Sequence, residues 1–460
     1  MKALKYIRLV LAAIMLLGIT ALLLDSTGVL RHWLGWMPKM QLLPAILGLN
    51  GLVIAAVIII TLVIGRFYCA VICPMGIFQD IFTWFHKIIF GKKRKFHYRK
   101  PATVLRYTVL ALFVIAMLVG LNQIAVLIAP YSAYARMVTG IHASGTVQWV
   151  AIITLVVIGL LSFTMGRIWC NAICPVGSLL GLISKYSIFG IKIDADKCVG
   201  CRKCEHGCKS MCIDIDNKTV DGSRCVNCFN CIDECNQGAI TLGRRSHRAN
   251  QEKQVDSSRR KFMAGTVAVG AAMAVQAQEQ KLDGGLAALA DKSVPDRKTP
   301  LKPFGARSLK NFSSRCTACQ LCVSQCPEHV LRPSTKLTSL LQPEMNYDKG
   351  YCRMACTRCS EVCPAGAIKP ITAEEKTAVS IGIAVTLHEN CLSAAGESCN
   401  ACSRHCPAAA ISMVTDPSTG HQVPSVNESR CLGCGACEYY CPARPMTAIY
   451  VEGREIHTEI

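Results

Sequence analysis

Residues 65–76 read GRFYCAVICPMG, and residues 166–177 repeat this stretch as GRIWCNAICPVG. The two copies are 101 residues apart, and each holds two cysteines four positions apart with a proline after the second. Residues four positions apart lie on one face of a helix, so each copy would present both of its thiols on the same side. An internal repeat of this kind predicts a fold built from two similar halves.

Apolar stretches lead into both copies and predict that this half of the chain lies in a membrane. Their lengths are close to the roughly 20 residues that a helix needs to cross a hydrocarbon core of about 30 Å. The alternative, buried helices of a water-soluble protein, would need polar stripes or frequent charges. We therefore predict four transmembrane helices, at residues 9–24, 42–64, 108–129 and 147–165, with surface helices at 77–90 and 179–189.

Basic residues in the short loops predict the orientation of these helices, because loops rich in lysine and arginine stay in the cytoplasm. The two loops on the other side of the membrane hold few basic residues. One holds Arg31 and Lys39 together with the acidic Asp25, and the other holds only Arg136. With four spans, residues 166–245 return to the cytoplasmic side of a bacterial inner membrane. The basic residues on that side are Lys2, Lys5, Arg8, Arg66, Lys87, Lys92, Lys93, Arg94, Lys95, Arg99 and Lys100.

The composition agrees with a membrane protein, since 51% of the 460 residues are hydrophobic. The formal net charge of +20 would suggest a nucleic-acid partner, but it treats the 29 cysteines as neutral. Of these cysteines, 24 fall into regular four-cysteine runs with the spacing of metal sites. An oxidised 4Fe-4S cluster with four thiolates carries about two negative charges, so several such clusters would cancel much of the excess. The remaining basic residues stand beside the apolar stretches, where anionic lipid attracts them. We predict no nucleic-acid partner.

Cysteine spacing predicts iron–sulfur clusters, because 24 cysteines fall into six runs of four with short gaps, unlike a disulfide framework. The first two runs have the CxxCxxCxxxC spacing of bacterial ferredoxins, in which the fourth cysteine binds the other cluster. Zinc is a weaker alternative, since its sites usually join two separate CxxC pairs. Neither run ends in Cys-Pro, and Cys212 is a spare thiol beside Cys208. The predicted ligand sets are Cys198, Cys201, Cys204 and Cys235, and Cys225, Cys228, Cys231 and Cys208.

Four further runs near the C-terminus predict four more clusters, which makes six in all. Every one of these runs ends in Cys-Pro, and the second and third have a widened first gap. The spacing does not decide which runs exchange their fourth cysteine, although neighbours in the chain are the default. The runs are Cys316, Cys319, Cys322 and Cys326; Cys352, Cys356, Cys359 and Cys363; Cys391, Cys399, Cys402 and Cys406; and Cys431, Cys434, Cys437 and Cys441.

Cys69, Cys73, Cys170 and Cys174 of the repeat could form one set of four if the two halves face each other. Three interpretations stay open: a further iron–sulfur cluster, a thiol–disulfide relay, or a structural or docking role. A hydrocarbon core of about 30 Å is too thick for one electron-tunnelling step. Quinone or a centre inside the membrane would therefore have to connect clusters on its two sides.

A segment rich in Arg, Ser, Gln and Ala separates the cysteine-rich parts and contains Ser258-Arg259-Arg260-Lys261-Phe262-Met263. This sequence has the form of a twin-arginine export signal, followed by a mild apolar run up to Ala277. The alternative is a basic linker with a coincidental arginine pair. Because twin-arginine transport moves folded proteins with their cofactors in place, we expect the part that follows to be periplasmic.

These observations predict a multi-domain membrane protein with α+β ferredoxin-like domains. The predicted parts are a four-helix transmembrane domain (1–185), a dicluster ferredoxin domain (186–243), a linker (244–305) and a four-cluster domain (306–460). No nucleotide-binding loop, flavin motif or catalytic triad is visible, so we expect no catalytic side chain. A quinone could contact the outer side through His32, Trp33 and Trp36, or through Tyr131, Tyr134, Arg136 and His142.

Residues 1–243 resemble the NapH/YccM-type membrane ferredoxin proteins, through the paired CxxxCP motifs at Cys69 and Cys170 and the dicluster that follows. Residues from about 257 to the end resemble the NapG/MauM-type polyferredoxins, through Arg259-Arg260 and the four C-terminal runs. The resemblance implies a fusion of the two, acting as the menaquinol dehydrogenase of a respiratory chain that supplies a periplasmic reductase or cytochrome. A NosR- or CcoG-like protein that supports the assembly of a metalloenzyme is the alternative.

Overall fold

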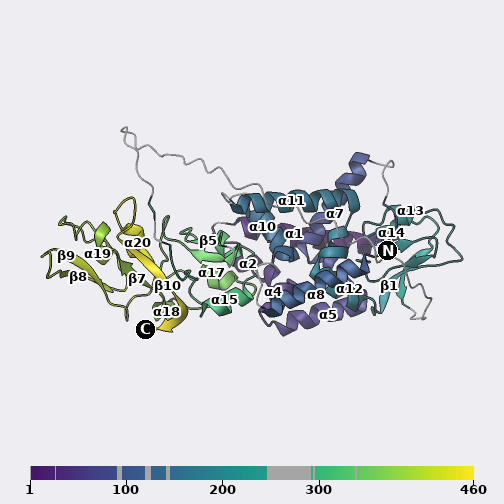
Figure 1. Cartoon of the computed structure of the whole chain (residues 1–460). Helices are drawn as coiled ribbons and strands as arrows, with labels where there is room; N and C mark the ends of the chain where they lie inside the picture. The colour runs from purple at the N-terminus through teal and green to yellow at the C-terminus, as the bar shows by residue number, and fades with distance from the viewer. Residues whose placement is uncertain are drawn as a thin grey trace.

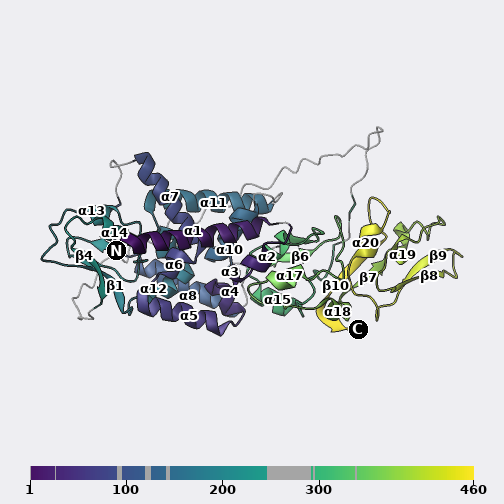
Figure 2. The same ribbon diagram turned by 180° about the vertical axis from the view of Figure 1, so that it is seen from behind.

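The computed structural model describes residues 2–25, 27–90, 96–119, 126–140, 146–245, 292–293, 296–336 and 339–460. The predicted export signal at Arg259 and Arg260 lies outside these residues. The molecule is elongated, with a helical part (residues 2–184) in the middle (Figure 1). The dicluster region (186–245) lies at one end and the C-terminal region (296–460) at the other, as the view from behind also shows (Figure 2).

The helical part contains long apolar helices joined by short ones. A turn of π-helix, η2, follows α11 at the second copy of the repeat. The bounds are α1 (Lys2–Leu24), α2 (Arg31–Leu34), α3 (Trp36–Lys39), α4 (Leu42–Leu47), α5 (Gly51–Ile64), α6 (Tyr68–Val71), α7 (Pro74–Phe90), α8 (Thr103–Val119), α10 (Pro130–Thr139), α11 (Thr146–Met165), η2 (Trp169–Ile173) and α12 (Pro175–Ser184).

The long helices expose apolar side chains on the face that does not pack against protein. In α11, Trp149, Ile153, Val156 and Leu160 follow each other at intervals of three or four residues and are each more than half exposed. In α1, Ile19 and its neighbours one turn away are buried, whereas Leu17 on the opposite face is 67% exposed. Apolar stripes of this extent fit lipid rather than water.

Two of the described helical segments, Leu4–Leu24 and Val147–Met165, are long and apolar enough to cross a membrane. They coincide with the first and fourth predicted spans. Three shorter apolar helices cover Gly51–Ile64, Thr103–Val119 and Pro175–Ser184. The chain therefore has features of a membrane-associated protein.

The second predicted span, residues 42–64, is not one continuous helix. It is divided into α4 and α5, because the chain turns at Gly48, Leu49 and Asn50. Leu49 has a left-handed backbone, and the Asn50 side chain accepts a hydrogen bond from the amide of Val53, which caps the start of α5. The predicted surface helix at 77–90 lies within α7, whereas the one at 179–189 matches α12 only as far as Ser184, because Phe189 begins a strand.

In the described residues, short helices and five two-stranded antiparallel sheets build the two cysteine-rich regions. The sheets pair β1 with β4, β2 with β3, β5 with β6, β7 with β10 and β8 with β9. The dicluster region contains β1 (Phe189–Ile193), α13 (Lys203–His206), β2 (Ile213–Asp214), β3 (Thr219–Val220), α14 (Asn230–Glu234) and β4 (Ile240–Arg244). The C-terminal region contains α15 (Leu309–Arg315), α16 (Leu321–Ser324), β5 (Leu331–Pro333), β6 (Pro343–Met345), α17 (Arg358–Val362), α18 (Ala373–Thr377), β7 (Val379–Thr386), η4 (His388–Asn390), α19 (Ala401–Arg404), β8 (Ile411–Thr415), β9 (Gln422–Val426), α20 (Ala436–Tyr440) and β10 (Ile449–Glu459).

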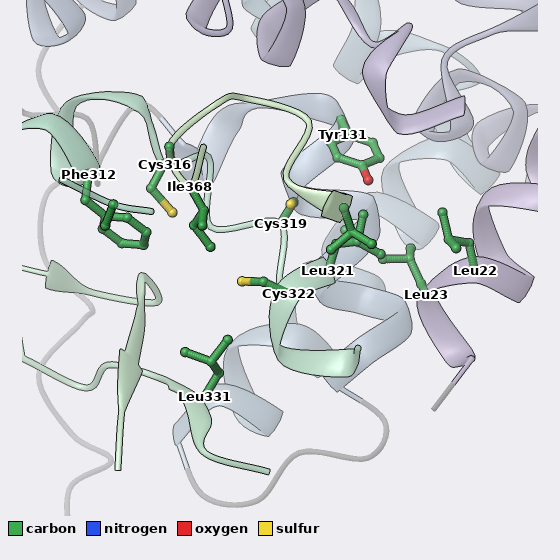
Figure 3. Packing of buried hydrophobic residues seen from close by; sticks show 14 of the residues in the cluster. Leu22, Leu23, Tyr131, Phe312, Cys316, Cys319, Leu321, Cys322, Leu331 and Ile368 are labelled. Carbon is green, nitrogen blue, oxygen red and sulfur yellow. The ribbon is translucent and has the colours of Figure 1, made fainter. Parts of the chain in front are cut away.

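Both regions pack directly on the helical part, at opposite ends of α1. Lys5 near the start of α1 forms an ion pair of 2.7 Å with Asp233 of the dicluster region. At the other end, the amide of Gln325 donates a hydrogen bond of 3.2 Å to the Leu22 carbonyl oxygen. Figure 3 shows Leu321 of α16 beside Leu22 and Leu23 of α1 in one buried cluster. The helix α1 therefore connects the two cysteine-rich regions.

Two glycines hold the repeat in a close turn. A Cβ atom on Gly76 would lie 2.1 Å from the Cys69 carbonyl oxygen, and one on Gly177 would lie 2.2 Å from the Cys170 carbonyl oxygen. Both contacts are with backbone atoms, so a larger residue would force the CxxxCP turn to open. The equivalence of the two clashes shows that the halves share this turn.

We predict that Gly76→Ala or Gly177→Ala lowers the free energy of unfolding by about 1–3 kcal/mol or more, as overpacking does in a buried site. Gly51→Ala is the matched control, because a Cβ atom there meets nothing within 4 Å. Thermal unfolding of the three variants in detergent measures the effect. If Gly76→Ala and Gly177→Ala both unfold at the same temperature as the unmodified protein, the turn is not constrained in this way.

Candidate metal centres

The thiols of the dicluster region surround two cavities. Cys198, Cys201 and Cys204 line the first together with Cys235, which belongs to the other run. The second cavity is lined by Cys225, Cys228, Cys231 and Cys208, and by Cys212 as well. The structure thus brings together the two crossed sets that the ferredoxin spacing predicts.

Cys212 is a fifth thiol at the second cavity. Its sulfur lies 3.6 Å from that of Cys208, and it is buried. The hydrogen bond between the two thiols lowers the pKa of Cys208 to about 6 and raises the pKa of Cys212. Both thiols line the second cavity, and the ferredoxin spacing assigns the fourth position to Cys208.

The C-terminal region shows the same exchange between neighbouring runs. Cys352, Cys356 and Cys359 share a cavity with Cys326 of the run before. Cys391, Cys399 and Cys402 share one with Cys441 of the run after. The first and second C-terminal runs are therefore partners, and so are the third and fourth.

The two remaining sets complete this pattern. Burial raises the pKa of the Cys316 and Cys322 thiols, and it raises the pKa of Cys319 to about 11. The nearby Cys363 thiol raises the pKa of all three further. In the fourth run, burial raises the pKa of Cys434 to about 12. Among the nearby thiols, Cys406 adds most to this increase. The sequence left this pairing open. The sets are Cys316, Cys319, Cys322 and Cys363, and Cys431, Cys434, Cys437 and Cys406.

A left-handed backbone on both sides of the second cysteine shapes four of the six runs. These residues have φ angles between +45° and +81°, which residues other than glycine adopt only at some cost. The turn aims backbone amides at sulfur, and the Ala318 amide donates to the Cys316 sulfur at 3.4 Å. Such concave amide loops suit anionic clusters. The flanking pairs are Gly200 and Arg202, Asn227 and Phe229, Ala318 and Gln320, and Gly433 and Gly435.

The thiol sets fit clusters better than single ions. In the described part of the chain, no three Cys, His, Asp or Glu side chains are arranged to hold one metal ion. A zinc site needs its ligands around a single atom, whereas each thiolate of a 4Fe-4S cluster binds a different iron, so its ligands stand farther apart. The zinc interpretation therefore lacks support among these residues.

A buried lysine contacts one of the C-terminal sets. The Lys376 ammonium donates to the Cys352 sulfur at 3.2 Å and to the carbonyl oxygens of Arg353 and Cys356, and it lies over the Phe304 ring. Lys376 also lines the cavity that these cysteines share. Hydrogen bonds to sulfur tune cluster potentials, so this cation would favour the reduced form of a cluster held there.

The four cysteines of the repeat come together inside the helical part. Cys69, Cys73, Cys170 and Cys174 are each at most 3% exposed. The pKa of Cys170 is lowered to about 6, because the hydrogen bond from the Cys174 thiol and the charges of Arg167 and Arg66 outweigh the effect of burial. The Gln79 side chain also donates a hydrogen bond to the Cys170 sulfur at 3.0 Å. The repeat therefore forms one buried tetrad with at least one activated thiol.

Two arginines connect the halves reciprocally. Arg66 of the first copy donates to the Cys170 carbonyl oxygen at 2.9 Å, and Arg167 of the second copy donates to the Cys69 carbonyl oxygen at 3.0 Å. Both side chains are fully buried. Each half thus fixes the cysteine turn of the other, and the two guanidinium groups place positive charge beside the tetrad.

Asp80 of α7 joins this arrangement to the dicluster region. Its carboxylate accepts from Arg167 at 2.6 Å, from Arg8 of α1 at 2.5 Å and from Lys209. Burial alone would raise the pKa of Asp80, but the charges of Arg167 and Lys209 outweigh it and hold the pKa well below its usual range. One carboxylate therefore pairs with cations from three segments.

Sequence reasoning assigned no role to Asp80, Gln79 or Lys376. A signal for Asp80 existed, because it is the only acidic residue between Asp25 and Asp194. A lone carboxylate among many cations must be paired if it is buried. Nothing in the cysteine spacing marks Gln79 or Lys376, since both reach their sulfur atoms only through the tertiary fold.

Two of the outer-side residues predicted to contact quinone make hydrogen bonds within the protein. Tyr134 is hydrogen-bonded to Thr20 at 2.6 Å, and Arg136 donates to the carbonyl oxygens of Val126 and Leu127. Tyr131 is buried near Cys319 (Figure 3). His32, Trp33 and Trp36 are exposed, as at a membrane surface, and His142 lies outside the described residues. A quinone site at these residues stays a prediction.

Comparison with sequence families identifies iron–sulfur domains in both halves of the chain. The family described as "4Fe-4S binding domain" matches residues 46–96 and 147–194, which contain the two copies of the repeat. The family described as "4Fe-4S dicluster domain" matches residues 315–367 and 397–444. The prediction of ferredoxin-type 4Fe-4S domains is therefore confirmed.

Curated relatives each match a part of the chain. It is 34% identical over 155 residues to the methylamine utilization ferredoxin-type protein MauM of Methylobacillus flagellatus, covering 31% of this chain and 64% of that protein. It is 29% identical over 170 residues to the ferredoxin-type protein NapH of Escherichia coli, covering 36% of this chain and 55% of that protein. It is 30% identical over 219 residues to the ferredoxin-type protein NapG of Haemophilus influenzae, covering 43% of this chain and 72% of that protein.

These matches confirm the predicted resemblance and are consistent with a fusion of NapH-like and NapG-like sequences. The chain spans between 53% and 64% of the length of the first curated relatives that it matches. No solved structure matches the chain.

We predict that Asp80→Asn lowers the free energy of unfolding by roughly 3–5 kcal/mol, because it leaves buried cations without their counter-charge. Asp216→Asn is the matched control: its carboxylate pairs with Arg202 but is 72% exposed, so removing it should cost less than about 1 kcal/mol. Thermal unfolding in detergent compares the two. Equal, small losses for both variants would show that Asp80 does not hold the segments together.

Proposed function

The chain belongs to the family of ferredoxin-type iron–sulfur proteins that includes MauM and NapG, and from this premise we propose that it carries electrons across a membrane, from quinol to a redox partner on the outer side. The observation that carries this proposal is the position of the thiols. Sets of four line cavities at both ends of the helical part, and the buried tetrad lies within it. A 4Fe-4S cluster bound by four thiolates accepts and releases single electrons.

We assign the 24 ferredoxin cysteines to six clusters in three crossed pairs. The two sets of the dicluster region form one pair, and the four C-terminal sets form two pairs. The tetrad of Cys69, Cys73, Cys170 and Cys174 would hold a further cluster. The family match over both copies of the repeat supports this assignment, and so do the activated Cys170 thiol and the two buried arginines beside the tetrad.

The division into four parts and the orientation belong to the same proposal. The helical part would cross an inner membrane four times, with α1, α5, α8 and α11 as spans. The N-terminus and residues 186–243 would be cytoplasmic, and residues 306–460 periplasmic. This is supported by the placement of the two cysteine-rich regions at opposite ends of the helical part (Figure 1) and by the exposed apolar stripes between them.

We propose menaquinol as the electron donor. Oxidation of one menaquinol to menaquinone releases two electrons and two protons; two clusters each take one electron, and water takes the protons. The chain would thus be the quinol-oxidising component of a respiratory chain, with a periplasmic reductase or cytochrome as the acceptor. No side chain has to form a covalent bond to the substrate in this reaction.

The first test is anaerobic and uses the full chain in detergent. We expect about 24 irons per chain from the six ferredoxin-type clusters, and more if the tetrad holds a cluster. Cys73→Ser with Cys174→Ser should remove only that excess. A menaquinol analogue should bleach the cluster absorbance rapidly. Full iron content without exchange with quinol, in either direction, would favour the NosR- or CcoG-like role in metalloenzyme assembly.

The second test concerns export. Replacing Arg259 and Arg260 by lysine should keep residues 306–460 in the cytoplasm, because a twin-arginine signal depends on both arginines. Protease or thiol-labelling access from the periplasm measures the location of that region. Replacing Arg244 and Arg245 by lysine is the control pair, since these residues precede the signal. Unchanged access after the Arg259 and Arg260 replacement would contradict export by this signal.

A further inference from the structure

A cavity of about 630 Å³ lies between α1, α7 and the dicluster region. This volume falls within the roughly 300–1,000 Å³ typical of small-molecule sites. One wall is apolar and consists of Leu9, Ala13 and Leu16 of α1 and Ile77, Ile81 and Trp84 of α7. On each helix these residues follow at intervals of three or four and so form one face. We call this space the α1–α7 cavity.

The apolar wall continues to the outside of the helical part. Leu9 is 55% exposed and Trp84 is 56% exposed. Their exposed surfaces belong to the apolar faces that fit lipid. A long apolar chain could therefore leave the cavity between α1 and α7 without crossing polar surface.

The opposite end of the α1–α7 cavity is polar. It is lined by Arg8, Asp80 and Lys209, and the Asp80 carboxylate pairs with both cations. Lys5 and Lys87 also line it, and they pair with Asp233 and Glu234. An ammonium group has three donor protons, so Lys5 and Lys87 each keep donors beyond the one that faces the carboxylate partner. A ligand carbonyl oxygen at this end would meet these donors.

The polar end adjoins one of the thiol cavities. Asn230 lines both the α1–α7 cavity and the cavity of Cys208, Cys225, Cys228 and Cys231. Gly207 and Lys209, on either side of Cys208, line the α1–α7 cavity too. A ring bound at the polar end would therefore lie directly beside a cluster site.

We propose that the α1–α7 cavity binds the ring of a membrane quinone, with its isoprenoid tail directed between α1 and α7 into lipid. The site rests on the proposed function, to which it adds the place of quinol binding. It lies at the dicluster end of the helical part and not at the outer side, where the sequence placed the candidate residues.

An anionic lipid headgroup is the competing ligand for the same cations. The structure favours the quinone, because every basic side chain that lines the polar end already has a carboxylate partner. A phosphate would have to displace these carboxylates, whereas a quinone carbonyl oxygen is uncharged and leaves the ion pairs in place. A lipid would also gain nothing from the neighbouring thiol cavity.

The test uses the full chain in detergent, a short-tailed photoreactive azido-menaquinone and menaquinone-4. Ala13→Phe fills the apolar wall, and Ala13 is exposed, so the larger ring need not disturb the core. Ala56→Phe is the matched control, exposed on α5 away from the cavity. We expect cross-links in residues 8–16 or 77–84, and at least tenfold weaker menaquinone-4 binding in Ala13→Phe only. Iron content and reduction by dithionite should be equal in both variants.

The outcomes separate this site from the function on which it rests. If menaquinol reduces the clusters and Ala13→Phe changes neither labelling nor affinity, the quinone binds elsewhere and the site is wrong. If menaquinol reduces no clusters in the unmodified chain, the proposed function itself fails. Loss of the label on adding phosphatidylglycerol, but not on adding menaquinone-4, would identify a lipid site instead and overturn the proposal.

Discussion

One carboxylate, 13% exposed, pairs with three buried cations, and the placement of the candidate centres depends on it. Asp80 receives Arg8 from the first helix, Arg167 from the second copy of the repeat and Lys209 from the dicluster region. Removing charges from water is costly, so each of these cations is held where the carboxylate can reach it. The pairing fixes the tetrad relative to the dicluster cavities and also closes the polar end of the α1–α7 cavity.

The reciprocal contacts of Arg66 and Arg167 complete this constraint. Each guanidinium group reaches the cysteine turn of the other half, so the tetrad exists only when both halves are in place. Arg167 belongs to both arrangements, because it contacts Cys69 and Asp80 together. Positive charge beside the thiols also favours thiolates, which are the form that binds metal. Assembly of the two halves therefore also brings the four thiols of the tetrad together.

The sequence predicts the parts of this structure that depend on local spacing. Short gaps between cysteines define each ligand loop, so the crossed sets around Cys235 and Cys208 follow from the runs alone. The pairing of Cys363 and Cys406 does not, because it depends on which runs pack together. The break at Asn50 was missed for a related reason: one polar side chain caps α5 within an otherwise apolar stretch. The partners of Asp80 and Lys376 are far away in the chain and have no periodic signal.

The central claim is that the chain conducts electrons from one end of the helical part to the other. Full-length protein in sealed, quinone-free lipid vesicles, with ferricyanide trapped inside and dithionite added outside, tests it most directly. The trapped ferricyanide should be reduced much faster than in vesicles without protein, and Cys73→Ser with Cys174→Ser should remove most of this difference. Reduction no faster than in empty vesicles, by protein with its full iron content, would contradict it.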